Sequence, residues 1–262
     1  MAHETIRISA DARGVATLTL ARPEKHNAMN ATMIAELAAA AEDLSARPGL
    51  RAVVLAAEGR SFCAGGDLGW MRDQMAADRA SRMAEARRLA DMLGALDTLP
   101  LPLIARVEGQ AFGGGIGLIS VADIALVARP GRMALTETRL GLIPATVAPY
   151  VVAKMGPARS REVIATGRGF DADGAVRLGL AARAVDPQEM DAALETEIAP
   201  VLAAAPAAVT AAKRLHRRLC GTITAEAVEA SVTALADQWE TPEAEAGIAA
   251  FFERRPPPWA AG

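Results

Sequence analysis

Three consecutive glycines, Gly113, Gly114 and Gly115, most constrain the fold of this chain. They stand between an apolar run at residues 103–107 and an apolar segment that ends at Asp123. The run is typical of a buried strand, and the segment after the glycines can form a helix. A ligand can lie directly on such a backbone, whose N–H groups would be the unpaired donors of a helix's first turn. The pattern predicts a site for an anion or a developing oxyanion, or else a turn that only lets two elements pack closely.

A second glycine-bearing turn, at residues 59–68, follows another short apolar run at residues 52–57. That run is continuous rather than alternating, as in the strands of a parallel sheet that are buried on both faces. Two strands therefore each end in a glycine turn. Because ligands of open α/β folds bind at the C-terminal ends of strands, we expect these turns to carry the ligand site.

The composition favours a mostly helical α/β protein. Of the 262 residues, 52% are hydrophobic but only 3% are aromatic, and abundant alanine favours packed helices over an all-β fold. A net charge of −3 without a basic arm disfavours nucleic acid as a partner. The N-terminal residues lack a basic segment followed by an apolar one, and no apolar run has the length of a membrane span. We therefore expect a cytoplasmic protein with no membrane partner.

The two cysteines, Cys63 and Cys220, cannot build a disulfide framework or a metal cluster. The sequence has no C-x-x-C or H-E-x-x-H motif, so we expect no bound metal and two reduced packing residues. A nucleophilic pair of Cys63 with His216 would need a proximity that nothing in the sequence indicates.

The rest of the chain alternates short strands with helices. Residues 6–9 and 15–21 predict a hairpin, and Asn30 is a good N-cap for a helix at residues 31–45. Residues 69–99 are weakly periodic and predict helices with a mobile start. Further elements are expected as strands at residues 123–128, 133–136 and 181–185, helices at residues 145–154, 158–166 and 172–178, and a nearly all-helical part from Pro187 onward.

Four motifs in register carry a resemblance to a known family. They are RPEKHNAM at residues 22–29, FCAGGD at residues 62–67, the glycines at residues 113–115 and LGLIP at residues 140–144. In these motifs and their spacing the sequence closely resembles the enoyl-CoA hydratase/isomerase, or crotonase, superfamily over nearly its whole length. The resemblance implies an α/β fold in two parts. Residues 1–196 would form a spiral of ββα units, and residues 197–262 a helical part that packs into trimers, often paired into hexamers.

The resemblance also implies an acyl-CoA site. By position, the backbone N–H groups of Gly66 and Gly114 would bind the thioester oxygen and stabilise an enolate. Coenzyme A would enter as part of the substrate, with no separate cofactor. Family members surround coenzyme A with residues at the positions of Lys25, His26, Ala28, Ala64, Asp67 and Leu68. Phe252 and Arg255 would complete the nucleotide pocket, either in their own subunit or in a neighbouring one. The alternative is that they only pack helices together.

Glu137 is the expected acid–base residue. It follows a short apolar strand beside Leu135 and Leu140, where burial would raise the pKa of its carboxyl and suit it to general acid–base work. The alternative is a structural glutamate that caps a turn or pairs with Arg139. Familiar hydratases of the family place two glutamates over the double bond. The second matches Glu137, whereas the first falls on Gly117, which departs from the two-glutamate mechanism.

One carboxylate can still activate water and return its proton to C2, or it can carry a proton from C2 to C4. We therefore expect a hydratase, with a Δ3-Δ2-enoyl-CoA isomerase as the alternative. Residues 67–71, 112–118 and 136–145 look most like bacterial methylglutaconyl-CoA hydratases of leucine breakdown, some of which also have glycine at the position of Gly117. A distal carboxylate on such a substrate would need an arginine. The candidates are Arg72, Arg82 and Arg139, of which the first two also fit a solvated helix face.

The sequence supports other roles for its acidic and glycine-rich positions less well. Glu108 precedes the glycine turn and could partly replace the missing carboxylate, but it fits a surface position at a strand end better. Asp123 fits a structural role, capping or bonding backbone. A dinucleotide-binding enzyme is disfavoured because Leu118 occupies the last glycine position of G-x-G-x-x-G. A non-catalytic acyl-CoA-binding or RNA-binding relative stays an alternative, on the sole ground of the absent first glutamate.

Overall fold

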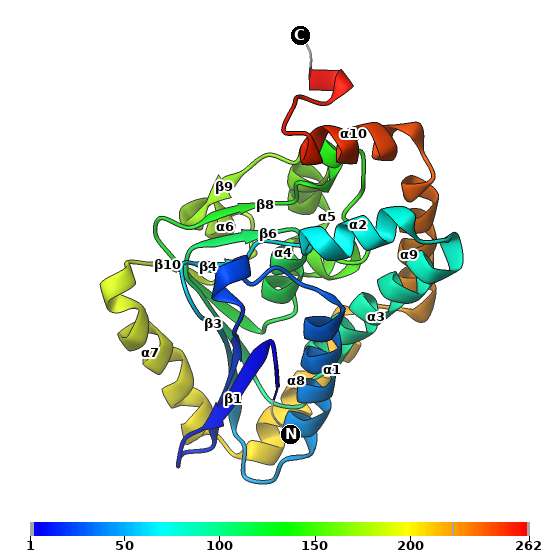
Figure 1. Ribbon diagram of the computed structural model, residues 1–262. Helices are drawn as coiled ribbons and strands as arrows, with labels where there is room; N and C mark the ends of the chain where they lie inside the picture. Colours follow the sequence, from blue (N-terminus) through cyan, green and yellow to red (C-terminus); the bar gives the residue numbers. More distant parts are fainter. Residues whose placement is uncertain (1–2, 222, 261–262) are drawn as a thin grey trace.

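The computed structural model describes residues 3–221 and 223–260 (Figure 1). Its centre is a six-stranded sheet in the order β1-β2-β3-β5-β7-β10. β1 and β2 form the predicted antiparallel hairpin, and all other neighbours are parallel. The strands are β1 (Ile6–Ala10), β2 (Val15–Leu20), β3 (Ala52–Ala57), β5 (Leu103–Val107), β7 (Ile124–Ala128) and β10 (Arg183–Val185).

A second sheet of four short strands carries the glycine turns. Its order is β4-β6-β8-β9, with β4, β6 and β8 parallel. Each of these three strands follows a strand of the larger sheet, so strand pairs and helices repeat along the chain and the expected spiral of ββα units is confirmed. Strands of two or three residues are too short to show periodicity, and β4, β6 and β9 were not predicted. The strands are β4 (Ser61–Cys63), β6 (Gln110–Phe112), β8 (Arg132–Ala134) and β9 (Phe170–Asp171).

Helices cover both faces of the larger sheet (Figure 1). They are α1 (Ala31–Ala46), α3 (Arg79–Asp97) and α7 (Met190–Ala203). The Asn30 side chain accepts a hydrogen bond from the Met33 N–H at 2.9 Å, which confirms the predicted N-cap of α1. α1 packs against α3 over the face that buries Val53. α7 covers the opposite face, where Ile198 packs against Val54, because neighbouring residues of a strand point to opposite faces.

Two helices, α4 (Gly114–Ser120) and α6 (Ala172–Arg177), pack against the second sheet. The other elements of this part of the chain are α2 (Leu68–Ala76), the 3-10 helix η2 (Glu137–Leu140) and α5 (Ala148–Ile164). α4 begins within the three glycines, as expected. α5 was predicted as two helices, and its backbone does break at Gly156, where φ is 77° just before Pro157.

The C-terminal part is helical, as expected. It comprises α8 (Pro206–Cys220), α9 (Ala225–Trp239) and α10 (Pro242–Phe252). α9 packs against α3, and α10 packs against η2. The expected boundary between residues 196 and 197 falls inside α7. Among residues 3–221 and 223–260, no single helix is long and apolar enough to cross a membrane, and residues 187–203 and 206–220 pass that test only as a pair bent by 105°.

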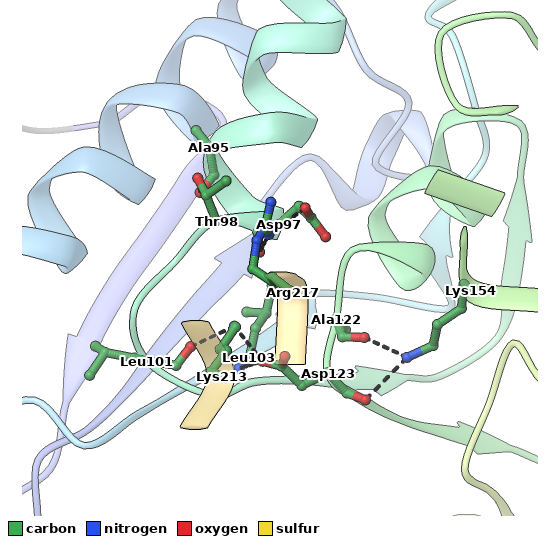
Figure 2. Close-up of polar contacts among 10 residues, drawn as sticks. All are labelled: Ala95, Asp97, Thr98, Leu101, Leu103, Ala122, Asp123, Lys154, Lys213 and Arg217. Atoms are coloured by element: carbon green, nitrogen blue, oxygen red, sulfur yellow. Dashed lines mark hydrogen bonds and ion pairs between the residues drawn. The ribbon is translucent and has the colours of Figure 1, made fainter. Parts of the chain in front are cut away.

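A polar network fastens α8 to the body of the chain (Figure 2). Lys213 donates to the Asp123 carboxylate at 2.5 Å and to the Leu101 carbonyl at 2.9 Å. The same Asp123 carboxylate accepts the Leu103 N–H at 2.7 Å, at the start of β5. The expected structural role of Asp123 is therefore confirmed.

Candidate active site

Both glycine turns open into one cavity of about 550 Å³. Gly65 and Gly66 follow β4, and Gly113 and Gly114 follow β6. Parallel pairing of β4 with β6 brings the ends of these strands to the same edge of the second sheet. The two turns that sequence places far apart therefore meet at one site, and most of the remaining lining is apolar.

The turns can approach because they lack side chains. A Cβ on Gly115 would stand 2.7 Å from the Cys63 carbonyl oxygen, and one on Gly114 would stand 2.3 Å from the terminal methyl carbon of Met29. Gly113 has a φ of 50°, which disfavours other residues there. At Gly66, by contrast, a Cβ would meet its nearest neighbours at an ordinary 3.5 Å.

The backbone N–H groups of Gly66 and Gly114 are free to bind a ligand. Neither N–H donates a hydrogen bond to another described residue, and both glycines line the cavity. Gly114 is the first residue of α4, where N–H groups have no partner within the helix. Two such donors facing one cavity can hold an oxygen that gains negative charge.

The Glu137 carboxyl lies against the second glycine turn. Its Oε1 is 2.8 Å from where a Cβ on Gly113 would stand, and its Oε2 is buried with no hydrogen-bond partner among the described residues. Burial raises the pKa of this carboxyl from 4.5 to about 7. Among the described residues, Glu137 Oε2 has no partner and no ion pair joins Glu137 to Arg139, so the alternative of a salt-bridged turn was wrong. The carboxyl is poised to gain or lose a proton near neutral pH.

Among the described residues, no second carboxylate lines the cavity beside Glu137. A Cβ on Gly117, one turn further along α4, would stand 2.6 Å from Cγ1 of Val147 and 3.5 Å from Cδ1 of Leu93. The space that a side chain at position 117 would need is filled. Within the described chain, Glu137 is the only acidic residue that lines the cavity.

Of the positions expected to surround coenzyme A, Ala64 and Leu68 line the cavity. Leu68 is half exposed, at 50%. Lys25, His26 and Ala28 lie in the loop before α1, where the His26 ring nitrogen Nδ1 is 3.0 Å from the Ser61 hydroxyl. This loop lies next to the first glycine turn, because the Ala64 N–H donates to the His26 carbonyl at 3.0 Å.

Asp67 holds the start of α2 in place. Its carboxylate accepts the Gly69 N–H at 2.8 Å and pairs with Arg22 at 3.0 Å. Burial alone would raise the pKa of Asp67, but hydrogen bonds from Arg22 and from the N–H groups of Gly69 and Trp70 outweigh burial and lower it. Within this chain, Asp67 acts on the cavity by fixing the loop between β4 and α2.

Phe252 and Arg255 do not line the cavity of their own chain. Phe252 packs into an apolar cluster with Ile248, under the Arg72 guanidinium at 4.5 Å. Arg255 pairs with Glu253. The neighbouring Phe251 lines the cavity instead.

Of the three arginines considered for a distal carboxylate, only Arg139 lines the cavity. Arg72 stacks on Phe252, and Arg82 lies 5.6 Å from the Trp239 ring while donating to the Gln74 carbonyl at 2.8 Å. Both therefore connect α2 and α3 with the C-terminal helices. Arg72 is exposed, as expected for a solvated helix face, although its guanidinium lies over the Phe252 ring. For Arg82, which is half-buried, that expectation was wrong.

The remaining candidates lie elsewhere. Glu108 pairs with Arg106 at 2.9 Å and does not line the cavity. Cys63 is fully buried, and burial raises the pKa of its thiol to about 12. His216 lies 3.3 Å from Cys220, its neighbour on α8, so it is not a partner of Cys63. Cys220 is exposed, which corrects the expectation that both cysteines pack inside.

The sequence did not identify the far wall of the cavity. That wall includes Leu89 of α3, Thr146 and Val147 before α5, and Leu235 and Trp239 of α9. These residues come from three segments that lie more than fifty positions apart in the sequence. Their mostly apolar character alone does not separate a cavity wall from ordinary core.

Comparisons with known proteins agree with this geometry. The family model described as "Enoyl-CoA hydratase/isomerase" matches residues 10–262. An enoyl-CoA hydratase from Shewanella pealeana superposes with a TM-score of 0.80 at 35% identity, covering 98% of this chain and 96% of that one. One from Mycobacterium smegmatis has a TM-score of 0.80 at 36% identity, with 98% and 99% covered. One from Mycobacterium avium has a TM-score of 0.86 at 30% identity, with 97% and 98% covered.

Proposed function

Because this chain belongs to the enoyl-CoA hydratase/isomerase family, we propose that it adds water across the 2,3 double bond of an acyl-CoA thioester. One observation carries the proposal. A buried carboxyl, Glu137, shares a cavity with two free backbone donors, the N–H groups of Gly66 and Gly114. Hydration needs this combination of a proton-transfer group and a site for negative charge.

The two N–H groups would bind the thioester oxygen. Attack of water on C3 moves the π electrons toward that oxygen and forms an enolate, which these donors stabilise. Each fixed donor of this kind is worth roughly 3 to 4 kcal/mol in a transition state. They cost little to orient, because the glycine turns hold them before substrate arrives.

Glu137 would move the proton. As a carboxylate it takes one proton from the attacking water, and as a carboxylic acid it returns that proton to C2 while the enolate collapses. A pKa of about 7 suits both steps, since neither form is strongly favoured at neutral pH. The net change is the addition of one water molecule.

We propose 3-methylglutaconyl-CoA, an intermediate of leucine degradation, as the substrate. Three segments of the sequence are most similar to hydratases of this compound, and Arg139 on the cavity wall could meet its distal carboxylate. The otherwise apolar lining suits the methyl-branched carbon chain.

Double-bond isomerisation is the second candidate. It is favoured by the single carboxyl, because moving a proton from C2 to C4 needs no second acid–base group and no water. The same enolate and the same N–H donors would serve it.

We also propose that the chain forms homotrimers or hexamers. α8 buries none of its residues in the single chain, and Leu215 and Leu219 are 55% and 76% exposed. Burying such an apolar helix face against another copy would remove it from water. Sedimentation would give the number of subunits.

The test of function is turnover of 3-methylglutaconyl-CoA and crotonyl-CoA by the wild type and by Glu137→Gln. Loss of the conjugated thioester absorbance reports hydration. We expect hydration of both substrates, faster for the first, and its loss in the variant. If the wild type hydrates neither but isomerises a 3-enoyl-CoA, the isomerase is the correct function. If it binds coenzyme A thioesters without converting any, the protein is a non-catalytic relative.

A further inference from the structure

Hydration with one carboxyl leaves the attacking water short of a second partner. We propose that the hydroxyl of Thr146 holds this water together with Glu137. The inference rests on the proposed hydratase function and adds a residue to it. Two observations support it: Val147 fills the space beside Gly117, and few polar side chains line the cavity.

α4 sets the positions of the two partners. Gly113 is the N-cap of α4, and Gly117 lies one turn further along, where its N–H donates to the Gly113 carbonyl at 3.2 Å. Glu137 lies against Gly113, and Val147 lies against Gly117. The segment that carries Val147 therefore occupies the space that a second acidic side chain on α4 would need. Thr146 is the residue before Val147 in that segment.

Thr146 is a buried polar residue with an unused hydroxyl. It is only 5% exposed, lines the same cavity as Glu137, and forms no side-chain hydrogen bond with another described residue. Among the described residues, Glu137 Oε2 is the buried side-chain atom without a partner, whereas the Thr146 hydroxyl is accessible from the cavity. A water molecule held between this hydroxyl and the Glu137 carboxylate would satisfy both groups.

The other polar side chains of the cavity fit the role less well. Gln110 already donates to the Ser61 hydroxyl at 3.2 Å. Arg139 has only donors, so it cannot accept a hydrogen from water. Thr136 directly precedes Glu137 and also lines a second hollow with Arg132, so it lies on the Glu137 side of the cavity.

The step is then balanced. The water oxygen forms the bond to C3 while one of its hydrogens passes to the Glu137 carboxylate and the other stays hydrogen-bonded to the Thr146 oxygen. The π electrons of C2 and C3 form the enolate held by Gly66 and Gly114. Glu137 then returns its proton to C2. The Thr146 hydroxyl stays neutral during the step, so it orients the water without setting the pH dependence of the hydration rate.

Thr146→Val tests this role because valine keeps the shape and removes the hydroxyl. We would measure hydration of the better enoyl thioester, and exchange of the C2 hydrogens of butyryl-CoA for deuterium, which needs Glu137 and the N–H donors but no attack by water. We expect hydration kcat to fall about 10- to 100-fold, as for one lost hydrogen bond in a transition state. Exchange and the pH profile should keep their wild-type values, and Thr146→Ser should restore hydration.

Two further measurements separate the outcomes. Thr196→Val makes the same change on exposed α7, where the hydroxyl bonds the Ala192 carbonyl at 2.8 Å, and it should leave both reactions unchanged. If Thr146→Val hydrates like the wild type, or loses exchange and hydration equally, the role of Thr146 is overturned. The hydratase function is not affected by either result. A wild type that exchanges C2 hydrogens but hydrates no enoyl thioester would overturn the hydratase function, and this inference with it.

Discussion

Replacing Glu137 by glutamine should stabilise the folded protein more at alkaline pH than at acidic pH. Oε2 of Glu137 is buried with no hydrogen-bond partner among the described residues, and burial raises the pKa of the carboxyl from 4.5 to about 7. A carboxyl whose pKa is higher in the folded than in the unfolded chain holds its proton more tightly when folded. Its contribution to stability is therefore complete below pH 4.5 and lost as the pH rises through about 7.

The size of the effect follows from the two pKa values. At about 1.4 kcal/mol per pKa unit, the rise from 4.5 to about 7 corresponds to about 3.5 kcal/mol. Glutamine has nearly the same shape and does not titrate. Any cost of burying its amide is the same at every pH, so the pH dependence isolates the carboxyl. The difference in unfolding free energy between variant and wild type should grow by about 2 to 3 kcal/mol between about pH 4.5 and about pH 8.

Urea unfolding followed by tryptophan fluorescence gives both free energies, since the chain has three tryptophans. Protein concentration must be fixed, because subunit association adds to apparent stability. Glu42→Gln, on the exposed side of α1, makes the same chemical change outside the cavity and provides the baseline. A difference between Glu137→Gln and the wild type that does not vary with pH would refute the argument from burial.

Four further outcomes follow from the same geometry. kcat/KM for hydration should fall about tenfold per pH unit below about pH 7, where Glu137 of the free enzyme is protonated, and a flat profile in initial rates would contradict this. Gly66→Ala should keep most activity, whereas Gly115→Ala should lose about 100-fold in kcat, because its Cβ would stand 2.7 Å from the Cys63 backbone oxygen and shift the adjacent Gly114 N–H. Gly117→Glu should lower the melting temperature by several degrees through its clash with Val147, and Val147→Gly in the same chain should recover part of that loss in calorimetry. Arg139→Gln should raise KM for 3-methylglutaconyl-CoA about tenfold and leave crotonyl-CoA unchanged in steady-state assays.

The sequence predicted the parts of the site that depend on local backbone. Gly113, Gly114 and Gly115 indicated a strand followed by a helix, because only glycine allows a ligand and a second turn so close to the chain. Glu137 was identified by the family resemblance and, independently, from its place after a short apolar strand. Both features are properties of a few neighbouring residues, so a sequence can show them.

The walls of the cavity depend on distant contacts and could not be predicted in the same way. Trp239 and Phe251 reach the cavity only because α9 packs on α3 and α10 packs on η2. Arg82 was expected on a solvated helix face because its aromatic partner, Trp239, lies far along the chain. A local pattern shows which residues are polar, but not which of them will be covered.

The pairing of Gly117 with Val147 makes the one-carboxylate site difficult to reverse. A glutamate at position 117 has no room while Val147 is present, and glycine at position 147 alone would leave a void in the core beside Leu93. Each single change costs stability, so a two-carboxylate site requires both changes together. The chemistry of the site must therefore be carried by Glu137 and by neutral groups that can hold water, and this is why the cavity hydroxyls matter more here than they would beside a second acid.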